Sequence, residues 1–420
     1  DNERDNQYTR AAEYLQTWLR AGALKEDDQD AIYGYVQDFE LGGTPYQRLS
    51  FIALARLEDF GKVVRPHEQI FAKPMQDRLS LERATAARFG LVFMLYEDPQ
   101  GVAERIITEA MTQEPPLATQ ASGTSTRVFA SGRPAHPGVS GSAVRGQETL
   151  ATIATEPLID FLDEQCVRHR LYAITAPEEI EAIEKMMQEK SCIIADGHHR
   201  YTVGLTYMRE SGNPKARYQM IAFSNMCQEG VVVLATHRLV GGIAGFQGGT
   251  FLAELERSFR LAPFKFTDKT RESAKQLMLA EMRRLHERAN TAVGLYLGDD
   301  SFYVAVLKDP SLMTAVAPDK SDAWRSLDVA VLQKLVLERQ LGLDEEKMGD
   351  ARYVEYIKDV PQAIDDMIER VDAGAKQIAF FTNPVRMPQL AEVTEAGERM
   401  PHKSTYFYPK MYTGLTIQKL

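Results

Sequence analysis

Apolar residues recur at helical spacing in some segments and at alternating spacing in others, which predicts that helices and strands interleave along the chain. The runs from Ala31 to Glu40 and from Leu49 to Leu57 alternate as strands do. A helix with Pro177 in its first turn is expected, because Thr175 and Glu178 have capping-box spacing. The elements do not follow a strict βαβ order. The pattern therefore predicts an α/β to α+β fold with mixed sheets and interleaved helices.

The length predicts more than one folding unit, since 420 residues are close to the size at which a single core divides. We expect an α/β domain over residues 1–245 and a C-terminal α/β domain over residues 246–420. Between 114 and 147 the composition shifts to Gly, Ser, Pro, Ala and Thr, which indicates a flexible insertion.

Charge and cysteine content indicate which partners and which cellular compartment to expect. The chain carries 49 basic and 59 acidic side chains, a net charge of −10, so its overall field would repel nucleic acid. Three cysteines without CxxC spacing indicate reduced thiols. The sequence has no run of 18 apolar residues, so it does not predict a membrane-spanning helix. We expect a cytoplasmic protein, with further residues upstream because the chain opens at Asp1 on a polar run.

The strongest local motif is a short apolar strand that runs into Asp196-Gly197-His198-His199-Arg200 and then into a helix. A helix that begins after a glycine turn exposes unpaired N–H groups and the positive end of its dipole, which suits an anion. Imidazole and guanidinium groups add donors for phosphate oxygens, and Asp196 could hold Mg²⁺. The alternative is structural: Asp196 caps the helix, one histidine packs in the core and Arg200 pairs with a carboxylate.

Three more polar clusters are candidates for chemistry. Glu68, next to His67 and Arg65, could act as a general base, or this stretch is a solvated loop. The run from Met400 to Lys410 combines hydroxyl, ammonium and aromatic groups, as a lid or pocket wall over an anion would, or else it is a surface tail. The third cluster closes a strand, where its alternative is an end that faces water: Thr236, His237 and Arg238.

Four segments in this order closely resemble the prokaryotic family known as domain of unknown function 1015. They are RPHEQIFAKPMQDRL, IADGHHRY, ATHRLV and MPHKSTYFYPKMYTGL, and LDVAVLQ at Leu327 to Gln333 and FFTNP at Phe380 to Pro384 extend the resemblance over nearly the whole chain. Two departures stand out: a PPYDV-like N-terminal motif is absent, and His402 stands where the family pattern suggests Gln.

The DGHHRY segment in turn resembles the phosphate-binding box of the ParB/sulfiredoxin-like superfamily, which includes free-serine kinases. This resemblance implies a ParB/sulfiredoxin-like nucleotide-binding core within residues 1–245. It maps the catalytic base of those kinases to Glu68 by analogy only, since the residues around Glu68 do not share the kinase pattern.

The first functional hypothesis is an ATP- or ADP-dependent kinase that phosphorylates a hydroxyl of a small metabolite, free L-serine being the named guess. Gly197, His198, His199 and Arg200 would hold the phosphates, and Asp196 a Mg²⁺ ion. Glu68, with His67, would take the hydroxyl proton. The groups expected to bind substrate or neutralise charge are Arg65, Thr236, His237, Arg238, Lys403, Ser404 and Thr405. No GxxxxGK[ST] sequence occurs, so a P-loop enzyme is excluded.

Two other classes stay open. A nucleotide-binding regulatory module of the ParB-like kind would use the same box without turnover. A metal-dependent hydrolase would draw ligands from His67, Glu68, His198, His199 and His237, although HExxH spacing is absent. We expect a small substrate and a nucleotide as ligands, neither membrane nor nucleic acid as a partner, and leave a homodimer open.

Overall fold

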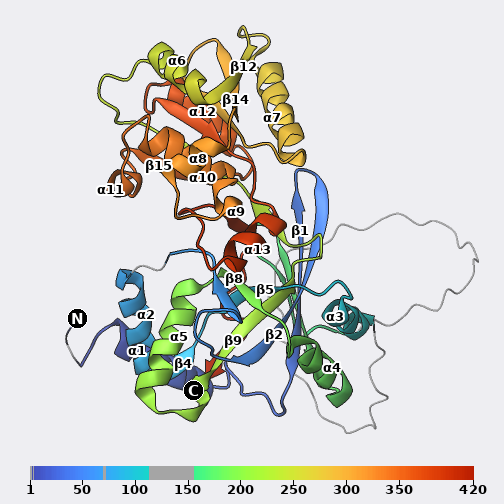
Figure 1. Cartoon of the computed structure of the whole chain (residues 1–420). Coiled ribbons are helices and arrows are strands. Elements are labelled where there is room, and N and C mark those ends of the chain that lie inside the picture. The colour runs from blue at the N-terminus through green and yellow to red at the C-terminus, as the bar shows by residue number, and fades with distance from the viewer. Residues whose placement is uncertain (1, 3, 70–71, 113–155) are drawn as a thin grey trace, which may run out of the picture.

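The computed structural model describes residues 2, 4–69, 72–112 and 156–420, and its helices and strands interleave in a mixed α/β arrangement (Figure 1). The predicted fold class is confirmed. The insertion expected at 114–147 lies outside the described residues. Among the described helices none is long and apolar enough to cross a membrane.

The larger sheet has eight strands and contains both parallel and antiparallel pairs. The β3–β8 and β5–β9 pairs are parallel, and the other pairs are antiparallel. In spatial order the strands are β3 (Val64–Pro66), β8 (Cys192–Asp196), β5 (Val92–Tyr96), β9 (Tyr218–Asn225), β2 (Thr44–Arg56), β1 (Ile32–Leu41), β7 (Arg168–Ile174) and β6 (Ile159–Leu162).

Helices pack around this sheet (Figure 1). Ile106 and Ile107 of α3 (Val102–Thr112) and Ile183 of α4 (Pro177–Met187) pack on the sheet with Val36 and Phe51. The remaining helices of this part are α1 (Gln7–Arg20), α2 (Ala72–Thr85), α5 (His198–Ser211) and the 3₁₀ turn η1 (Pro214–Arg217). The two-residue strands β4 (Ala87–Arg88) and β18 (Gln418–Lys419) pair with each other.

The second sheet has six strands, all paired antiparallel. In spatial order they are β12 (Phe259–Lys265), β14 (Ser301–Leu307), β13 (Ala292–Tyr296), β16 (Ile378–Phe381), β11 (Thr236–Val240) and β15 (Val354–Lys358). The helices around it are α6 (Gly248–Ser258), α7 (Arg271–Glu287), α8 (Ser311–Val316), α9 (Asp322–Arg325), α10 (Asp328–Val331), the π-helix η2 (Leu332–Glu338), α11 (Glu345–Met348), α12 (Ala363–Asp372) and α13 (Met387–Glu395).

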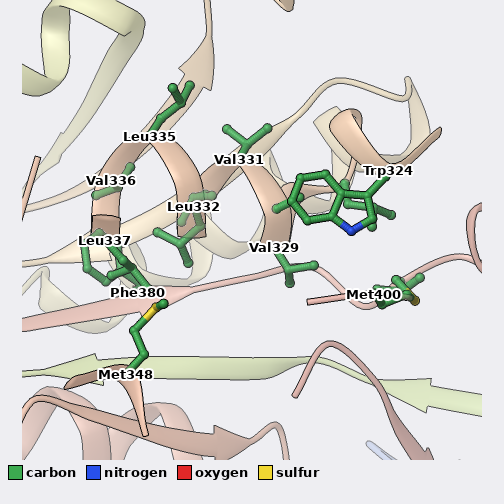
Figure 2. Packing of buried hydrophobic residues seen from close by; sticks show 14 of the residues in the cluster. Trp324, Val329, Val331, Leu332, Leu335, Val336, Leu337, Met348, Phe380 and Met400 are labelled. Carbon is green, nitrogen blue, oxygen red and sulfur yellow. The ribbon is translucent and has the colours of Figure 1, made fainter. Parts of the chain in front are cut away.

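One hydrophobic cluster joins the two sheets. It holds Trp324, Leu332 and Phe380 around the six-stranded sheet (Figure 2) and continues to Phe93 and Ile193 of the eight-stranded sheet. Strand β10 (Val232–Leu234) lies in sequence between the strands of the two sheets. It pairs with β17 (Tyr406–Tyr408), which comes from the C-terminal region. The C-terminal region therefore packs against the chain where it passes from one sheet to the other.

Three local predictions differ from the structure. No side chain caps α4, whose N-cap is Ala176, so the capping box at Thr175 is wrong. Helix α2 begins at Ala72, four residues after Glu68, in a stretch for which a solvated loop was the alternative. The run Thr236–Val240 is a buried strand of its own with partners on both sides, whereas the sequence suggested a strand end.

Candidate functional site

A parallel strand pair brings two of the predicted clusters together. In β3 and β8, Arg65 pairs with Ile193 and Pro66 with Ile194, so both strands end at the same edge of the sheet. His67 and Glu68 follow the first strand, and Asp196 ends the second. Parallel pairing thus places these two segments side by side, although about 130 residues separate them in sequence.

Asp196 is followed by a left-handed turn that starts α5. Gly197 has φ of 92° and ψ of 24°, and no side chain caps the first turn of the helix. An ideal Cβ at this position would lie 3.0 Å from Nε and 3.0 Å from an Nη atom of Arg200. Glycine is therefore needed twice, for the positive φ and for the room that the guanidinium occupies.

His67 and His198 form a buried network that holds this edge together. Nε2 of His198 accepts hydrogen bonds from the backbone N–H groups of His67 (3.2 Å) and Glu68 (3.4 Å). One ring nitrogen of His67 bonds the carbonyl oxygen of Ile194 at 2.5 Å, and the other bonds the hydroxyl of Thr405 at 2.8 Å. Both histidines are less than 5% exposed. The network fixes where Glu68 stands relative to the Asp196 turn.

The role of His198 as an acceptor requires a neutral ring. Burial, followed by the neighbouring His67, lowers the pKa of His198 to about 2. The same cause lowers the pKa of His67. Both rings are therefore uncharged at neutral pH.

The pH dependence of stability should reveal this neutral ring. Below about pH 6.5 the unfolded chain binds a proton at His198 that the folded chain does not, so the free energy of unfolding should fall with decreasing pH. The contribution of one such group is up to about 1.4 kcal/mol per pH unit. In His198→Gln, whose amide oxygen can accept the same two N–H groups, urea unfolding between pH 7.5 and 5.5 should show a shallower decline. Parallel curves for the two proteins would contradict the neutral-acceptor role.

Asp196 holds two cations from distant segments. Its carboxylate accepts from Nη2 of Arg200 at 2.7 Å and from Nζ of Lys410 at 3.0 Å. Burial opposes ionisation of this group, but Lys410 and Arg200 outweigh it and lower the pKa of Asp196 below its ordinary value. Lys410 also lies 4.6 Å from the ring centre of Tyr406. The carboxylate stays ionised and orients both cations at the N-terminus of α5.

Substitution of Gly197 by alanine should disturb both the turn and Arg200. The φ of +92° costs an alanine about 1–3 kcal/mol, and its Cβ would push the guanidinium away from Asp196. Gly212→Ala is a matched control, because Gly212 ends the same helix at φ of +64° with nothing within 4 Å of its ideal Cβ. Both variants should lower the midpoint of thermal unfolding, but Gly197→Ala should lower it more, because only its Cβ would meet another side chain. Equal midpoints in the two variants would contradict the close contact between Gly197 and Arg200.

Further cations lie near His199. Burial is the main cause that lowers the pKa of His199, and the charges of Arg78, Lys403 and Arg200 add to it, whereas Glu68 opposes it. The charge of Arg399 likewise contributes to the lowered pKa of His198. In a chain with a net charge of −10, this edge is thus a local concentration of positive charge.

Three predicted residues do not join this group. The guanidinium of Arg65 bonds the hydroxyl of Ser191, at the beginning of β8 and so at the opposite end from Asp196. Thr236 and His237 are buried in the six-stranded sheet. Nδ1 of His237 accepts from the N–H of Thr382 at 3.2 Å, and its Nε2 lies 3.4 Å from Asp359. These contacts give Thr236 and His237 places in the sheet rather than in the group around Asp196.

The C-terminal segment, which we define as residues 400–412, contributes more than the sequence suggested. Thr405 bonds His67, and Lys403 lies exposed with a φ of 56°. Ser404 is buried and donates to the carbonyl of Pro401 at 2.5 Å. Arg238 is buried and donates to the carbonyl of Lys403 at 3.2 Å. Lys410 was not among the predicted site residues; a lone lysine 214 residues from Asp196 gives no signal of their pairing.

A metal would find few protein ligands here. Within the part of the chain that the structure describes, no group of three or more His, Cys, Asp or Glu side chains could hold a metal ion. Both ring nitrogens of His67 are engaged by Ile194 and Thr405, and Nε2 of His198 accepts two N–H groups. Two of the five ligands expected for a metal-dependent hydrolase, His67 and His198, are therefore engaged in structural contacts.

A cavity of about 530 Å³ lies on the eight-stranded sheet but away from the polar group. Its walls are mainly apolar and include Ala53, Ala55, Ile183 and Phe223. None of the predicted site residues lines it. Because the predicted site residues gather at the Asp196 turn and none of them lines this cavity, we place the candidate site at that turn.

Comparison with known families identifies the chain. The model of the family described as "Protein of unknown function (DUF1015)" matches residues 1–136 and 141–330. The chain belongs to this family. Its predicted membership is thereby confirmed, and a search of the curated proteins finds no match.

Three solved structures show distant similarity to the family member described here. A mutant free serine kinase in complex with ADP is 10% identical, with coverage of 85% of this chain and 87% of that one and a TM-score of 0.36. A conserved hypothetical protein from Pyrococcus furiosus is 10% identical (86% and 93%, TM-score 0.34). SbnI with a C-terminal truncation, from Staphylococcus aureus, is 10% identical (87% and 86%, TM-score 0.37). At these scores we transfer neither fold nor activity from them.

Proposed function

We propose that this DUF1015 protein is a nucleotide-dependent kinase that transfers a phosphoryl group to the hydroxyl of a small metabolite, with free L-serine as the first acceptor to test. The observation that supports this most is the cationic edge around an uncapped helix N-terminus. Arg200 and Lys410 are held there on Asp196, and Arg78, Lys403 and Glu68 lie close enough to His199 for their charges to act on it. Such an arrangement suits the oxygens of a polyphosphate.

Phosphoryl transfer depends on positioning and charge neutralisation more than on covalent chemistry. In the proposed step, Glu68 accepts the proton of the acceptor hydroxyl while the hydroxyl oxygen forms a bond to the terminal phosphorus of ATP or ADP. The bond from that phosphorus to the bridging oxygen breaks, and ADP or AMP leaves. Glu68 is 29% exposed in its side chain, so a substrate can reach it.

The residues of the candidate site have four roles in this proposal. Gly197, His199, Arg200 and Lys410 bind the phosphates, and Lys403 offsets charge on the group in transfer. His67 and His198 position Glu68 through their buried hydrogen bonds and do not themselves exchange protons. Asp196 orients the two cations. A single carboxylate suits a Mg²⁺ ion that arrives with the nucleotide, because Mg²⁺ keeps several waters beside one or two carboxylates.

Turnover assays test this proposal. The protein is incubated with Mg²⁺ and ATP or ADP across a panel of amino acids and sugars, and nucleotide loss and phosphorylated product are followed by ³¹P NMR. Formation of AMP or ADP together with a phosphomonoester supports the kinase. Binding of nucleotide without turnover favours a ParB-like regulatory module. Hydrolysis that a chelator abolishes and Zn²⁺ but not Mg²⁺ restores would favour the metal-dependent hydrolase.

A further inference from the structure

Two fully buried arginines, one from each large sheet, bind the C-terminal segment. Arg48 on β2 has no exposed surface and is in none of the described ion pairs. It donates to the carbonyl of Pro409 at 2.6 Å and to that of Tyr408 at 3.4 Å, and it lies 4.9 Å from the ring centre of Phe93. Burial lowers its pKa to about 10.

Arg238 on β11 makes the equivalent contacts from the six-stranded sheet. It is 3% exposed and donates to the carbonyls of Lys403 at 3.2 Å and His402 at 3.5 Å. Its guanidinium lies 5.3 Å from the ring centre of Tyr356, and burial lowers its pKa to about 10. Like Arg48, it is in none of the described ion pairs.

Burial of a cation without a carboxylate partner costs free energy. Both arginines nevertheless donate hydrogen bonds to backbone carbonyls of one short stretch of the chain. A guanidinium can donate to two successive carbonyls at once, which an ammonium on a flexible stem does less well. The contacts at 402–403 and at 408–409 lie on either side of Thr405, the partner of His67. The segment is thus held near both ends.

The Arg48 contact continues directly to the candidate site. The amide oxygen of Gln37 accepts from Nε of Arg48 at 3.1 Å, and its amide nitrogen donates to the carbonyl of Lys410 at 3.1 Å. The side chain of that same Lys410 pairs with Asp196. Two residues later, the N–H of Tyr412 donates to the hydroxyl of Tyr35 at 3.3 Å.

We propose that Arg48 and Arg238 are positioning residues that complete the candidate site from the two sheets. Arg48 sets the backbone from which Lys410 reaches Asp196, and Arg238 sets the backbone that presents Lys403. The site then requires the C-terminal segment in one fixed position, and each sheet supplies one anchor. The consequence for ligand binding rests on the proposed nucleotide function, whereas the anchoring of the segment does not.

Hydrogen exchange and nucleotide binding together test this inference. The variants are Arg48→Met and Arg238→Met, which remove the charge with similar bulk, and the matching Arg→Lys variants. Amide exchange in the peptides that cover residues 400–412 should rise about tenfold or more in the Met variants and less in the Lys variants, with the remaining strands still protected. Affinity for ADP should fall about tenfold in each Met variant.

Arg88→Met is the control for loss of a buried arginine outside the C-terminal segment; unlike Arg48 and Arg238, Arg88 also pairs with a buried carboxylate, that of Glu82, at 2.8 Å. Arg88 is also a buried arginine that binds backbone carbonyls, but its acceptors include Ala216 at 3.3 Å and Tyr218, outside the C-terminal segment. It should lower overall stability without selective exchange at residues 400–412. The inference is overturned if folded Arg48 and Arg238 variants keep the segment protected, or if Arg88→Met exposes it equally. Where a Met variant does not fold, the Lys variant is used for the same comparison.

These readouts separate the inference from the proposed function. If the wild-type protein neither binds nor consumes nucleotide, the kinase proposal fails, while selective exchange at residues 400–412 still supports the two anchors. If the wild type binds ADP and folded Met variants bind it unchanged, the kinase proposal stands and the positioning role is rejected.

Discussion

Replacement of Glu68 by glutamine is expected to reduce the rate of phosphoryl transfer by about 10²- to 10⁴-fold while ADP or ATP affinity stays within about threefold of wild type. The amide keeps the size and hydrogen-bonding reach of the side chain but cannot accept the hydroxyl proton. His67 and His198 fix the backbone of this residue, so the substitution should leave the surrounding structure intact. Single-turnover rates at saturating acceptor, with nucleotide affinity from calorimetry, measure the two effects separately.

Glu58→Gln provides the comparison for Glu68→Gln. Glu58 pairs with Arg56 at 2.7 Å outside the candidate site, so its substitution should not change the rate. A Glu68→Gln enzyme that keeps a third or more of the wild-type rate would remove Glu68 as the base. Loss of nucleotide affinity equal to the loss of rate would instead assign Glu68 to binding.

The turn at Asp196 was predictable because its determinants are local. A short apolar strand, a glycine and a helix-forming segment are adjacent in sequence, and the backbone has few ways to connect them. The structural alternative for this motif holds in part: His198 is buried and Arg200 pairs with Asp196. These contacts organise the cations at the helix N-terminus and do not remove them from it.

The convergence of His67 and Glu68 on this turn was not predictable. It depends on β3, which has three residues and pairs in parallel with β8. So short a strand has no periodicity to read, and the partner of a parallel strand is set by the tertiary fold. The resemblance of Glu68 to a kinase base was analogy, and only the pairing of β3 with β8 places it near Asp196.

Another difference between the sequence prediction and the structure concerns polar residues in a buried strand. Polar side chains near the end of a strand usually face water, which is why Thr236, His237 and Arg238 read as a strand end. In the structure, the hydroxyl of Thr382 donates to the carbonyl of Thr236 at 2.9 Å, and the guanidinium of Arg238 donates to backbone carbonyls, so these two residues have hydrogen-bond partners inside the protein. A single sequence does not reveal such distant partners.

Replacement of Arg200 by methionine is expected to weaken nucleotide binding by about 10- to 150-fold, which corresponds to the loss of a charged hydrogen bond to phosphate worth about 1.5–3 kcal/mol. The guanidinium is held by Asp196 at 2.7 Å, and its Nε is buried with no hydrogen-bond partner among the described residues. The Arg200 side chain is 29% exposed, so an anion can reach the guanidinium beside the helix N-terminus. Arg200→Lys should retain part of the affinity, because an ammonium keeps the charge but not the fork geometry.

Arg209→Met is the matched control for Arg200→Met, because it makes the same change on the same helix at the far end. Arg209 pairs with Asp59 on the surface, where an ion pair contributes little to stability. Calorimetric titration with ADP should show wild-type affinity for this control and a marked loss for Arg200→Met, at similar midpoints of thermal unfolding. If Arg200→Met binds ADP as the wild type does, Arg200 is not a phosphate ligand.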